Sequence, residues 1–254
     1  MRNVSNNSTE QNNGDLNISF ISFYATIRKR KKYTIIVLNK REENNNMCKS
    51  IFNADKMYTF IRGFATGAKM PETLKALSFA RKKHEGQFRK SGDPYFVHPL
   101  TMACNALSLG IRDDEIIATI LLHDVCEDCN VSLLELPVNE KVKRGVELMT
   151  FTVMDGETKE IAKNRYYNLI LESREAAITK IIDRCHNVSS MAGTFSKEKL
   201  TAYIEETRKY VFPLLRKIKE QYPEDAEMLF VLKYHMSSVV DSIEATMQVF
   251  EESC

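Results

Sequence analysis

The stretch YFVHPLTMACNALSLGIRDDEIIATILLHDVCED, residues 95–128, holds the pattern that decides the fold. Its apolar residues recur every three or four positions on both sides of Gly110, which predicts two helices joined by a short turn. Pro99 suits the first turn of the first helix, and Asp113 or Asp114 suits the cap of the second. Because a short turn makes neighbouring helices antiparallel, the pattern predicts a helical hairpin.

The same helical periodicity continues along the chain, and the alternation typical of strands is missing after residue 57. The second helix of the hairpin is expected to run to Asp128. Further helices are expected over residues 71–84, 140–149, 159–172, 175–191, 197–222 and 224–252. The sequence therefore predicts an all-α fold, a bundle of about eight or more helices between residues 57 and 252.

The first part of the chain has a different composition. Residues 1–15 are polar and rich in asparagine, which is typical of disorder. Residues 1–41 hold eight Lys or Arg and two Asp or Glu, although the whole chain carries a net charge of only +2. We therefore divide the chain into an N-terminal extension, residues 1–56, that is disordered or peripheral, and a helical domain, residues 57–254. The basic run Arg28–Lys32 is expected to be solvated, so nucleic acid is not an expected partner.

The composition excludes several classes of protein. Hydrophobic residues make up 43% and charged residues 28%, as in ordinary globular proteins. The apolar stretches are shorter than the ~20 residues of a membrane span, and we see no signal peptide. The six cysteines lack the spacing of a disulfide framework, so we expect a reducing cytoplasm. Cys126 and Cys129 form a CxxC without a matching second pair, which we interpret as coincidental.

Polar residues gather at one end of the predicted hairpin. His123 and Asp124 are followed by Glu127 and Asp128 at the end of the second helix, where the helix dipole disfavours carboxylates. A bound cation would compensate for this gathering of negative charge. Because the two helices have nearly equal lengths, His98, just before the first, should reach the same end as His123.

A further ligand is expected from the helix over residues 175–191. The run KIIDRCHN (180–187) places polar side chains inside an otherwise apolar helix, which is costly in a core unless they are satisfied. Asp183 is therefore expected to join His98, His123 and Asp124 around one divalent metal ion. Two imidazoles and two carboxylates suit Mn²⁺, Fe²⁺ or Zn²⁺, and Mn²⁺ is the ion we expect.

Three segments carry a resemblance to a known family: HEGQFRKSGDPYFVHPL (84–100), LLHDVCED (121–128) and KIIDRCHN (180–187). They resemble the HD superfamily of metal-dependent phosphohydrolases. More narrowly, they look like the (p)ppGpp hydrolase domain of the RelA/SpoT family. The resemblance implies an HD-type helical bundle that binds a small-molecule nucleotide. It also implies removal of the 3′-pyrophosphate from (p)ppGpp, an alarmone of the stringent response, to give GDP or GTP.

The resemblance also implies roles for particular residues. The metal ligands would be the four residues named above, and Glu127 and Asp128 would handle the attacking water. His84 and His186 belong to the motifs and are expected to hydrogen-bond or pack rather than to bind the metal. The implied substrate contacts are Arg89, Lys90, Tyr95, Lys180, Asn187 and Ser190.

The chain departs from the family pattern at one position that bears on the substrate. The family's Val-Thr-Lys segment reads Met149–Phe151 here, so one basic contact is missing. This leaves open a phosphatase acting on another nucleotide such as NADPH. A catalytically silent nucleotide-binding regulator is a third hypothesis, against which the complete set of metal and acidic residues argues. The sequence shows no likeness to the family's synthetase domain, so we expect no alarmone synthesis.

Overall fold

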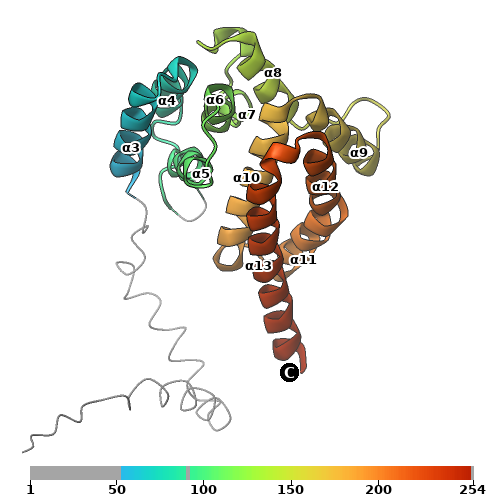
Figure 1. Ribbon diagram of the computed structural model, residues 1–254. Helices are drawn as coiled ribbons and strands as arrows, with labels where there is room; N and C mark the ends of the chain where they lie inside the picture. Colours follow the sequence, from blue (N-terminus) through green and yellow to red (C-terminus); the bar gives the residue numbers. More distant parts are fainter. Residues whose placement is uncertain (1–52, 90–91, 253–254) are drawn as a thin grey trace, which may run out of the picture. The chain divides into compact units, whose positions relative to one another are not determined.

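The computed structural model describes residues 53–89 and 92–252, and every named element within these ranges is a helix (Figure 1). The one pairing of strand type in these ranges is an isolated bridge between Phe88 and Pro94. The predicted all-α fold is therefore confirmed. Most of the predicted N-terminal extension, together with Lys90, lies outside the described residues.

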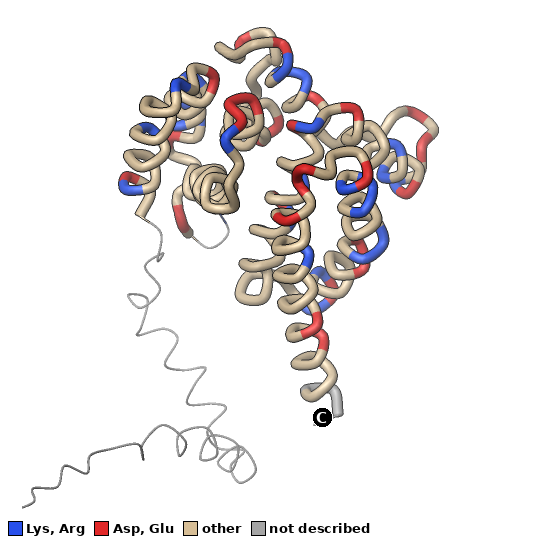
Figure 2. Tube along the Cα trace, in the orientation of Figure 1, with Lys and Arg blue, Asp and Glu red and all other residues tan. Residues whose placement is uncertain are grey.

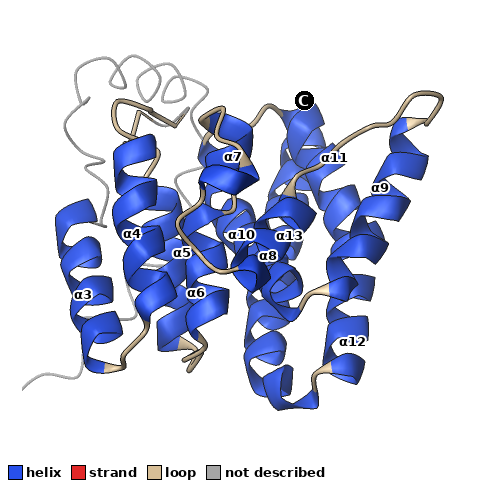
Figure 3. Cartoon of the chain, turned by 90° about the horizontal axis from the view of Figure 1, so that it is seen from above, coloured by secondary structure: helices blue, strands red, loops and turns tan. Residues whose placement is uncertain are grey.

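The helices follow one another in chain order with short connections. They are α3 (Ala54–Gly67), α4 (Pro71–Lys83), α5 (Val97–Ser108), α6 (Asp114–Leu122), α7 (Val125–Asp128), α8 (Glu140–Met149), α9 (Lys159–Leu169), α10 (Arg174–Ser190), α11 (Lys197–Glu206), α12 (Phe212–Gln221) and α13 (Ala226–Glu252). Short 3₁₀ turns occupy Leu133–Glu135, Ile170–Glu172, Met191–Gly193 and Pro223–Asp225, and a π-helical turn, Thr207–Val211, joins α11 to α12. Figure 3 shows this layout from above.

Two helices form the centre of the bundle. Every residue of α6 from Ile116 to Leu122 is buried, as expected of a helix that is apolar on all sides. α6 contacts α4, α5, α8 and α10, and α10 in turn contacts α5, α12 and α13. α8 comes close to α6 at Gly145, where a Cβ would lie 2.9 Å from Thr119 Oγ1. Figure 2 shows that α5 carries no Lys, Arg, Asp or Glu, whereas such residues are spread over the outer helices.

Side-chain caps align the first turns of α4 and α6. The residue before α4 provides no side-chain cap, and the carboxylate of Asp114 accepts hydrogen bonds from the N–H groups of Glu72 (3.0 Å) and Thr73 (2.7 Å). Asp113 caps α6 itself by accepting from the N–H of Ile116 at 3.0 Å. Two neighbouring carboxylates thus satisfy the unpaired N–H groups of two helices. The beginnings of α4 and α6 therefore lie side by side.

The predicted helix that ends at Asp128 is wrong in one respect. α6 ends at Leu122 and α7 begins at Val125, so His123 and Asp124 lie at a break between two helices. Asp124 has φ −99° and ψ −6°, in the bridge region that turns and active-site residues often occupy. The break consequently places a histidine and an aspartate where the backbone changes direction.

Two predicted helix starts also need correction. α5 begins at Val97, two residues before Pro99, so His98 lies within the first turn of the helix rather than before it. The first described helix begins at Ala54, ahead of residue 57, because Asn53 caps it by accepting from the N–H of Lys56 at 3.0 Å.

The single helix expected over residues 197–222 is divided by the π-helical turn Thr207–Val211. Pro213 follows this turn, and proline neither donates a backbone hydrogen bond nor fits against the preceding turn of an α-helix. A wider turn before a proline accommodates both effects.

Two expectations about the class of protein can be compared with the described residues. None of the helices in this part of the chain is both long and apolar enough to cross a bilayer. The four cysteines found here, which include Cys126 and Cys129, are free.

Candidate metal centre

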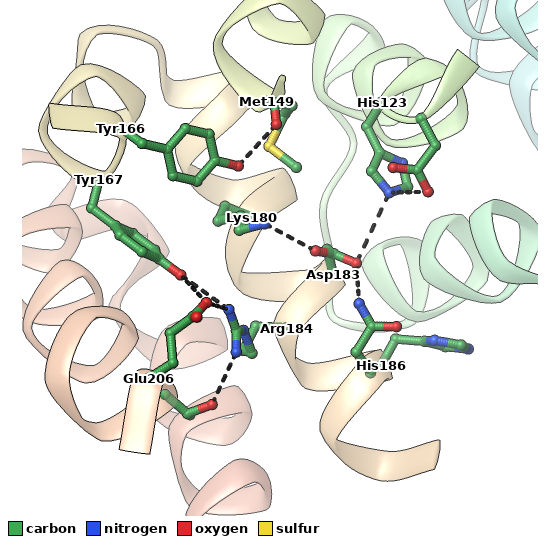
Figure 4. A network of polar contacts seen from close by, with 12 residues as sticks. His123, Met149, Tyr166, Tyr167, Lys180, Asp183, Arg184, His186 and Glu206 are labelled. Atoms are coloured by element: carbon green, nitrogen blue, oxygen red, sulfur yellow. Dashed lines mark hydrogen bonds and ion pairs between the residues drawn. The ribbon is translucent and has the colours of Figure 1, made fainter. Parts of the chain in front are cut away.

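Two histidines and two aspartates from three parts of the chain meet at one point. Asp124 Oδ2 lies 3.0 Å from His123 Nε2 and 3.7 Å from His98 Nε2. Asp183 Oδ1 lies 3.4 Å from His98 Nε2 and 3.9 Å from His123 Nε2. Figure 4 shows His123, at the end of α6, facing Asp183 on α10. The structure therefore brings together the four residues expected to hold a metal ion.

The ring of His123 is oriented toward this point by the backbone. Its Nδ1 lies 2.9 Å from the carbonyl oxygen of Ile120 and donates to it, so Nε2 is the ring nitrogen directed at the carboxylates. Nε2 is buried and faces the carboxylate oxygens of Asp124 and Asp183 at 3.0 and 3.9 Å. A cation at this point would bind this nitrogen and both carboxylates at once.

The electrostatics of the site favour positive charge where the four residues meet. Burial alone would lower the pKa of His123, but the carboxylates of Asp124 and Asp183 outweigh burial and raise this pKa to about 9. Burial would raise the pKa of Asp124, yet His123 lowers it far below its ordinary value. The pKa of Asp183 is lowered in the same way, against burial, chiefly by Lys180. Nitrogen and oxygen donors in such a field fit a divalent metal ion.

Three of the expected substrate contacts hydrogen-bond the two aspartates. Tyr95 Oη donates to Asp124 Oδ2 at 2.5 Å. Lys180 Nζ donates to Asp183 Oδ2 at 3.2 Å (Figure 4). Asn187 Nδ2 donates to Asp183 Oδ1 at 2.6 Å. Partners of this kind orient the carboxylates of a metal site.

The other expected substrate contacts are placed differently. Arg89 Nη2 donates to Asn187 Oδ1 at 3.2 Å, and its Nη1 is buried without a hydrogen-bond partner among the described residues. Ser190 is exposed, and its hydroxyl donates to the carbonyl oxygen of His186 at 3.2 Å in its own helix. Lys90 is outside the described residues. Arg89 therefore lies at the site with a donor available, whereas Ser190 lies at its edge.

The two carboxylates expected to act in catalysis lie on α7, immediately after Asp124. Glu127 and Asp128 are both exposed. The protein around the exposed Glu127 still removes part of its hydration, and this desolvation, followed by the negative charges of Asp124 and Asp128, raises the pKa of Glu127 above its ordinary value. Such a shift moves a carboxylate toward the range in which it exchanges protons near neutral pH. The backbone oxygen of Asp128 accepts from Gln87 Nε2 at 3.1 Å, which ties α7 to the loop before α5.

A polar network that the sequence did not predict lies beside Asp183. The next residue, Arg184, is only 3% exposed, and its Nη2 donates to Tyr167 Oη at 3.0 Å and to Glu206. Its Nη1 donates to Thr207 Oγ1 at 3.3 Å, at the start of the π-helical turn. The one signal in the sequence was a charged residue on the buried face of a predicted helix.

The two motif histidines that are not expected ligands both make hydrogen bonds, as predicted. His186 Nδ1 lies 3.0 Å from His98 Nδ1. Burial, reinforced by the positive charge that His98 and Arg89 bring near it, lowers the pKa of His186 to about 3, so this ring is neutral. The other histidine, His84, is buried with its Nδ1 2.8 Å from Gln87 Oε1.

Comparisons with known proteins identify the family. The model of the family described as "HD domain" matches residues 76–217. The guanosine-3′,5′-bis(diphosphate) 3′-pyrophosphohydrolase of Aquifex aeolicus is 35% identical over 152 residues, which cover 58% of this chain and 21% of that protein. The GTP pyrophosphokinase rsh of Brucella melitensis is 31% identical over 147 residues, 55% of this chain and 19% of that protein. The chain thus spans about a fifth of the length of these curated relatives.

Among the solved structures similar to this chain is one described as "A metazoan ortholog of SpoT hydrolyzes ppGpp and plays a role in starvation responses". It has 23% sequence identity and a TM-score of 0.48, and the match covers 59% of this chain and 94% of that one. The family match includes all four residues that meet at the candidate metal centre and extends over more than half of the sequence. The chain therefore belongs to the HD domain family.

Proposed function

We propose that the chain is a metal-dependent phosphohydrolase that removes the 3′-pyrophosphate from (p)ppGpp. The observation that carries the proposal is that two imidazoles and two carboxylates converge at one point inside the bundle. Two further carboxylates lie on the adjoining helix α7. The names of relatives that match this segment support the choice of substrate. Each of those relatives is much longer than the matched segment, so the activity is a proposal for this chain.

His98, His123, Asp124 and Asp183 would hold one divalent ion, for which we propose Mn²⁺. Nitrogen and carboxylate donors in equal number suit an ion of intermediate hardness. Such an ion neutralises phosphate charge and lowers the pKa of a water molecule bound to it. Tyr95 and Lys180 would keep the two carboxylates in place through the hydrogen bonds described above.

Glu127 and Asp128 would act on the attacking water. Glu127 follows the ligand Asp124 by one turn, and its raised pKa suits a group that takes a proton near neutral pH. Asp128 would accept a hydrogen bond from the same water and so orient it. Neither residue is assigned to the metal, so a change at either should separate chemistry from metal binding.

Arg89 would bind the nucleotide. Its guanidinium is planar and has a buried Nη1 with no hydrogen-bond partner in the described ranges. Those properties suit a phosphate or the face of a base. Asn187, Lys90 and Ser190 would add contacts to ribose or phosphate around it.

One observation favours a second candidate substrate. Phe151 stands where the resembled family has a basic residue, and its ring packs edge-on against Tyr166 with centroids 5.4 Å apart. Tyr166 in turn lies 5.4 Å from Lys180 Nζ. An apolar ring thus approaches the site where a cation was expected, which favours a different phosphorylated nucleotide such as NADPH. For either substrate we propose a cytoplasmic location, since the described cysteines are free.

The test uses purified protein with Mn²⁺ and separate incubations with ppGpp, pppGpp and NADPH. We expect one pyrophosphate and one GDP for each ppGpp consumed, with orthophosphate and pyrophosphate measured separately. Orthophosphate released from NADPH alone would identify the second candidate. Binding of nucleotide without turnover would indicate a silent regulator. Asp183→Asn serves as the inactive control, with circular dichroism to show that its helices are retained.

A further inference from the structure

The two histidines at the candidate metal centre have different partners at their second ring nitrogen. His123 Nδ1 contacts the backbone carbonyl of Ile120 at 2.9 Å, whereas His98 Nδ1 contacts the ring of His186 at 3.0 Å between the two Nδ1 atoms. His186 lies on α10, one turn after Asp183. The same helix therefore supplies one of the four converging residues and the hydrogen-bond partner of another.

The geometry determines which atom donates in the contact between the two histidines. His98 Nε2 faces Asp183 Oδ1 at 3.4 Å and Asp124 Oδ2 at 3.7 Å, so Nε2 is the nitrogen directed at the metal position. A histidine that binds a metal through Nε2 carries its proton on Nδ1. His98 Nδ1–H must then donate, and His186 Nδ1 must accept, which places the proton of His186 on its Nε2.

We propose that His186 is a positioning residue: by accepting the hydrogen bond from His98 Nδ1–H, it sets the tautomer and the ring orientation in which His98 binds the metal ion. The inference rests on the metal assignment of the proposed function. His98 is 3% exposed, so water has little access to replace this partner. Loss of such a partner usually lowers metal affinity by ~10–100-fold.

Three variants and one control test the role. His186→Phe keeps a ring and removes the acceptor, and His186→Ala removes the acceptor without adding bulk. His186→Asn keeps an oxygen acceptor close to the position of Nδ1. The control is His235→Phe, a histidine on α13 that is exposed and whose Nε2 lies 2.8 Å from Ser189 Oγ, away from the four converging residues. The Mn²⁺ dissociation constant of each metal-free protein is measured by isothermal titration calorimetry without nucleotide.

We expect His186→Phe and His186→Ala to raise the Mn²⁺ dissociation constant by ~10–100-fold. His186→Asn should recover most of this loss, and His235→Phe should match the parent protein. Thermal melts of the metal-free proteins should be alike, because the role concerns the ion and not the core.

Two outcomes would overturn the role of His186. An unchanged Mn²⁺ dissociation constant in both the Phe and the Ala variant would show that the contact between His186 and His98 contributes only to packing. An equal loss in the Phe, Ala and Asn variants, at unchanged melting temperature, would show that the imidazole itself is required. A parent protein that binds no divalent ion would instead refute the metal assignment on which both proposals depend.

Discussion

Replacing Glu206 with Gln should destabilise the helical domain by about 3 kcal/mol at neutral pH. Glu206 pairs with Arg184 and Lys163, and Arg184 is 3% exposed. Burial by itself would raise the pKa of Glu206, but Arg184 and Lys163 lower it from an ordinary 4.5 to about 2. Since one pKa unit corresponds to about 1.4 kcal/mol, the charged carboxylate contributes roughly 3 kcal/mol. Removing one partner of a buried ion pair has an effect of the same order, ~3–5 kcal/mol.

The pH dependence of this effect has a definite sign. The folded protein holds the pKa of Glu206 below the value in the unfolded chain, so the contribution to stability is complete above pH 4.5. It declines as the pH falls from there toward 2. The difference in unfolding free energy between parent and Glu206→Gln should therefore be constant between neutral pH and pH 5, and smaller at pH 3.5. Urea denaturation followed by circular dichroism measures it at each pH.

The matched control is Glu160→Gln. Glu160 also pairs with a lysine, Lys209, but both side chains are more than half exposed, with 64% and 58% of their surface accessible. Exposed pairs contribute little to stability, so this variant should unfold like the parent. A loss below ~1 kcal/mol in Glu206→Gln at neutral pH, or one that stays constant down to pH 3.5, would refute the reasoning.

Four further predictions concern the site and the ends of the chain. Asp124→Ala should abolish metal binding, and full occupancy by elemental analysis would count against the ligand assignment. Glu127→Gln should lower kcat by ~10²–10⁴-fold with little change in KM or metal content. Loss of the metal in this variant would show that Glu127 is a ligand, and the catalytic role would then fall to Asp128. Arg89→Ala should raise KM in steady-state kinetics, because a contact made in both ground and transition states contributes uniform binding. An unchanged KM would exclude a contact between Arg89 and the nucleotide. Deleting residues 1–46 should leave hydrolysis and the melting temperature intact, and a lower melting temperature would show that the extension packs on the core.

The bounds of a helix could be predicted from the sequence where its capping residue and its apolar periodicity indicate the same ends. The helix Glu140–Met149 was predicted to the residue, since Asn139 caps it and its apolar positions face the core. The break at His123 and Asp124 was not predictable, because the apolar pattern of α6 continues through Val125 without interruption. At the break, Asp124 contacts side chains that are distant in sequence, such as Tyr95, and periodicity does not reveal such contacts.

The residues that meet at the site could be predicted from motifs, whereas most of their partners could not. His98 and Asp183 lie in recognisable segments, and their convergence follows from the packing of α5 on α10. The pairing of Arg184 with Glu206 depends on the π-helical turn that follows Glu206, which periodicity does not reveal. A polar residue on a buried helix face indicates that a partner exists, but only the tertiary structure shows which one.

The division between α6 and α7 has a consequence for local stability. α7 has only four residues, one of them buried. The amide of Asp128 and that of the next residue, Cys129, bond back to Asp124 and Val125. α6, by contrast, is enclosed on all sides, so its amides should exchange with solvent deuterium only when the whole domain unfolds. The amides of α7 should exchange much sooner, through local opening. In the proposed phosphohydrolase, the carboxylates of α7 would thus lie on a segment that opens more readily than the helix that ends at the neighbouring histidine.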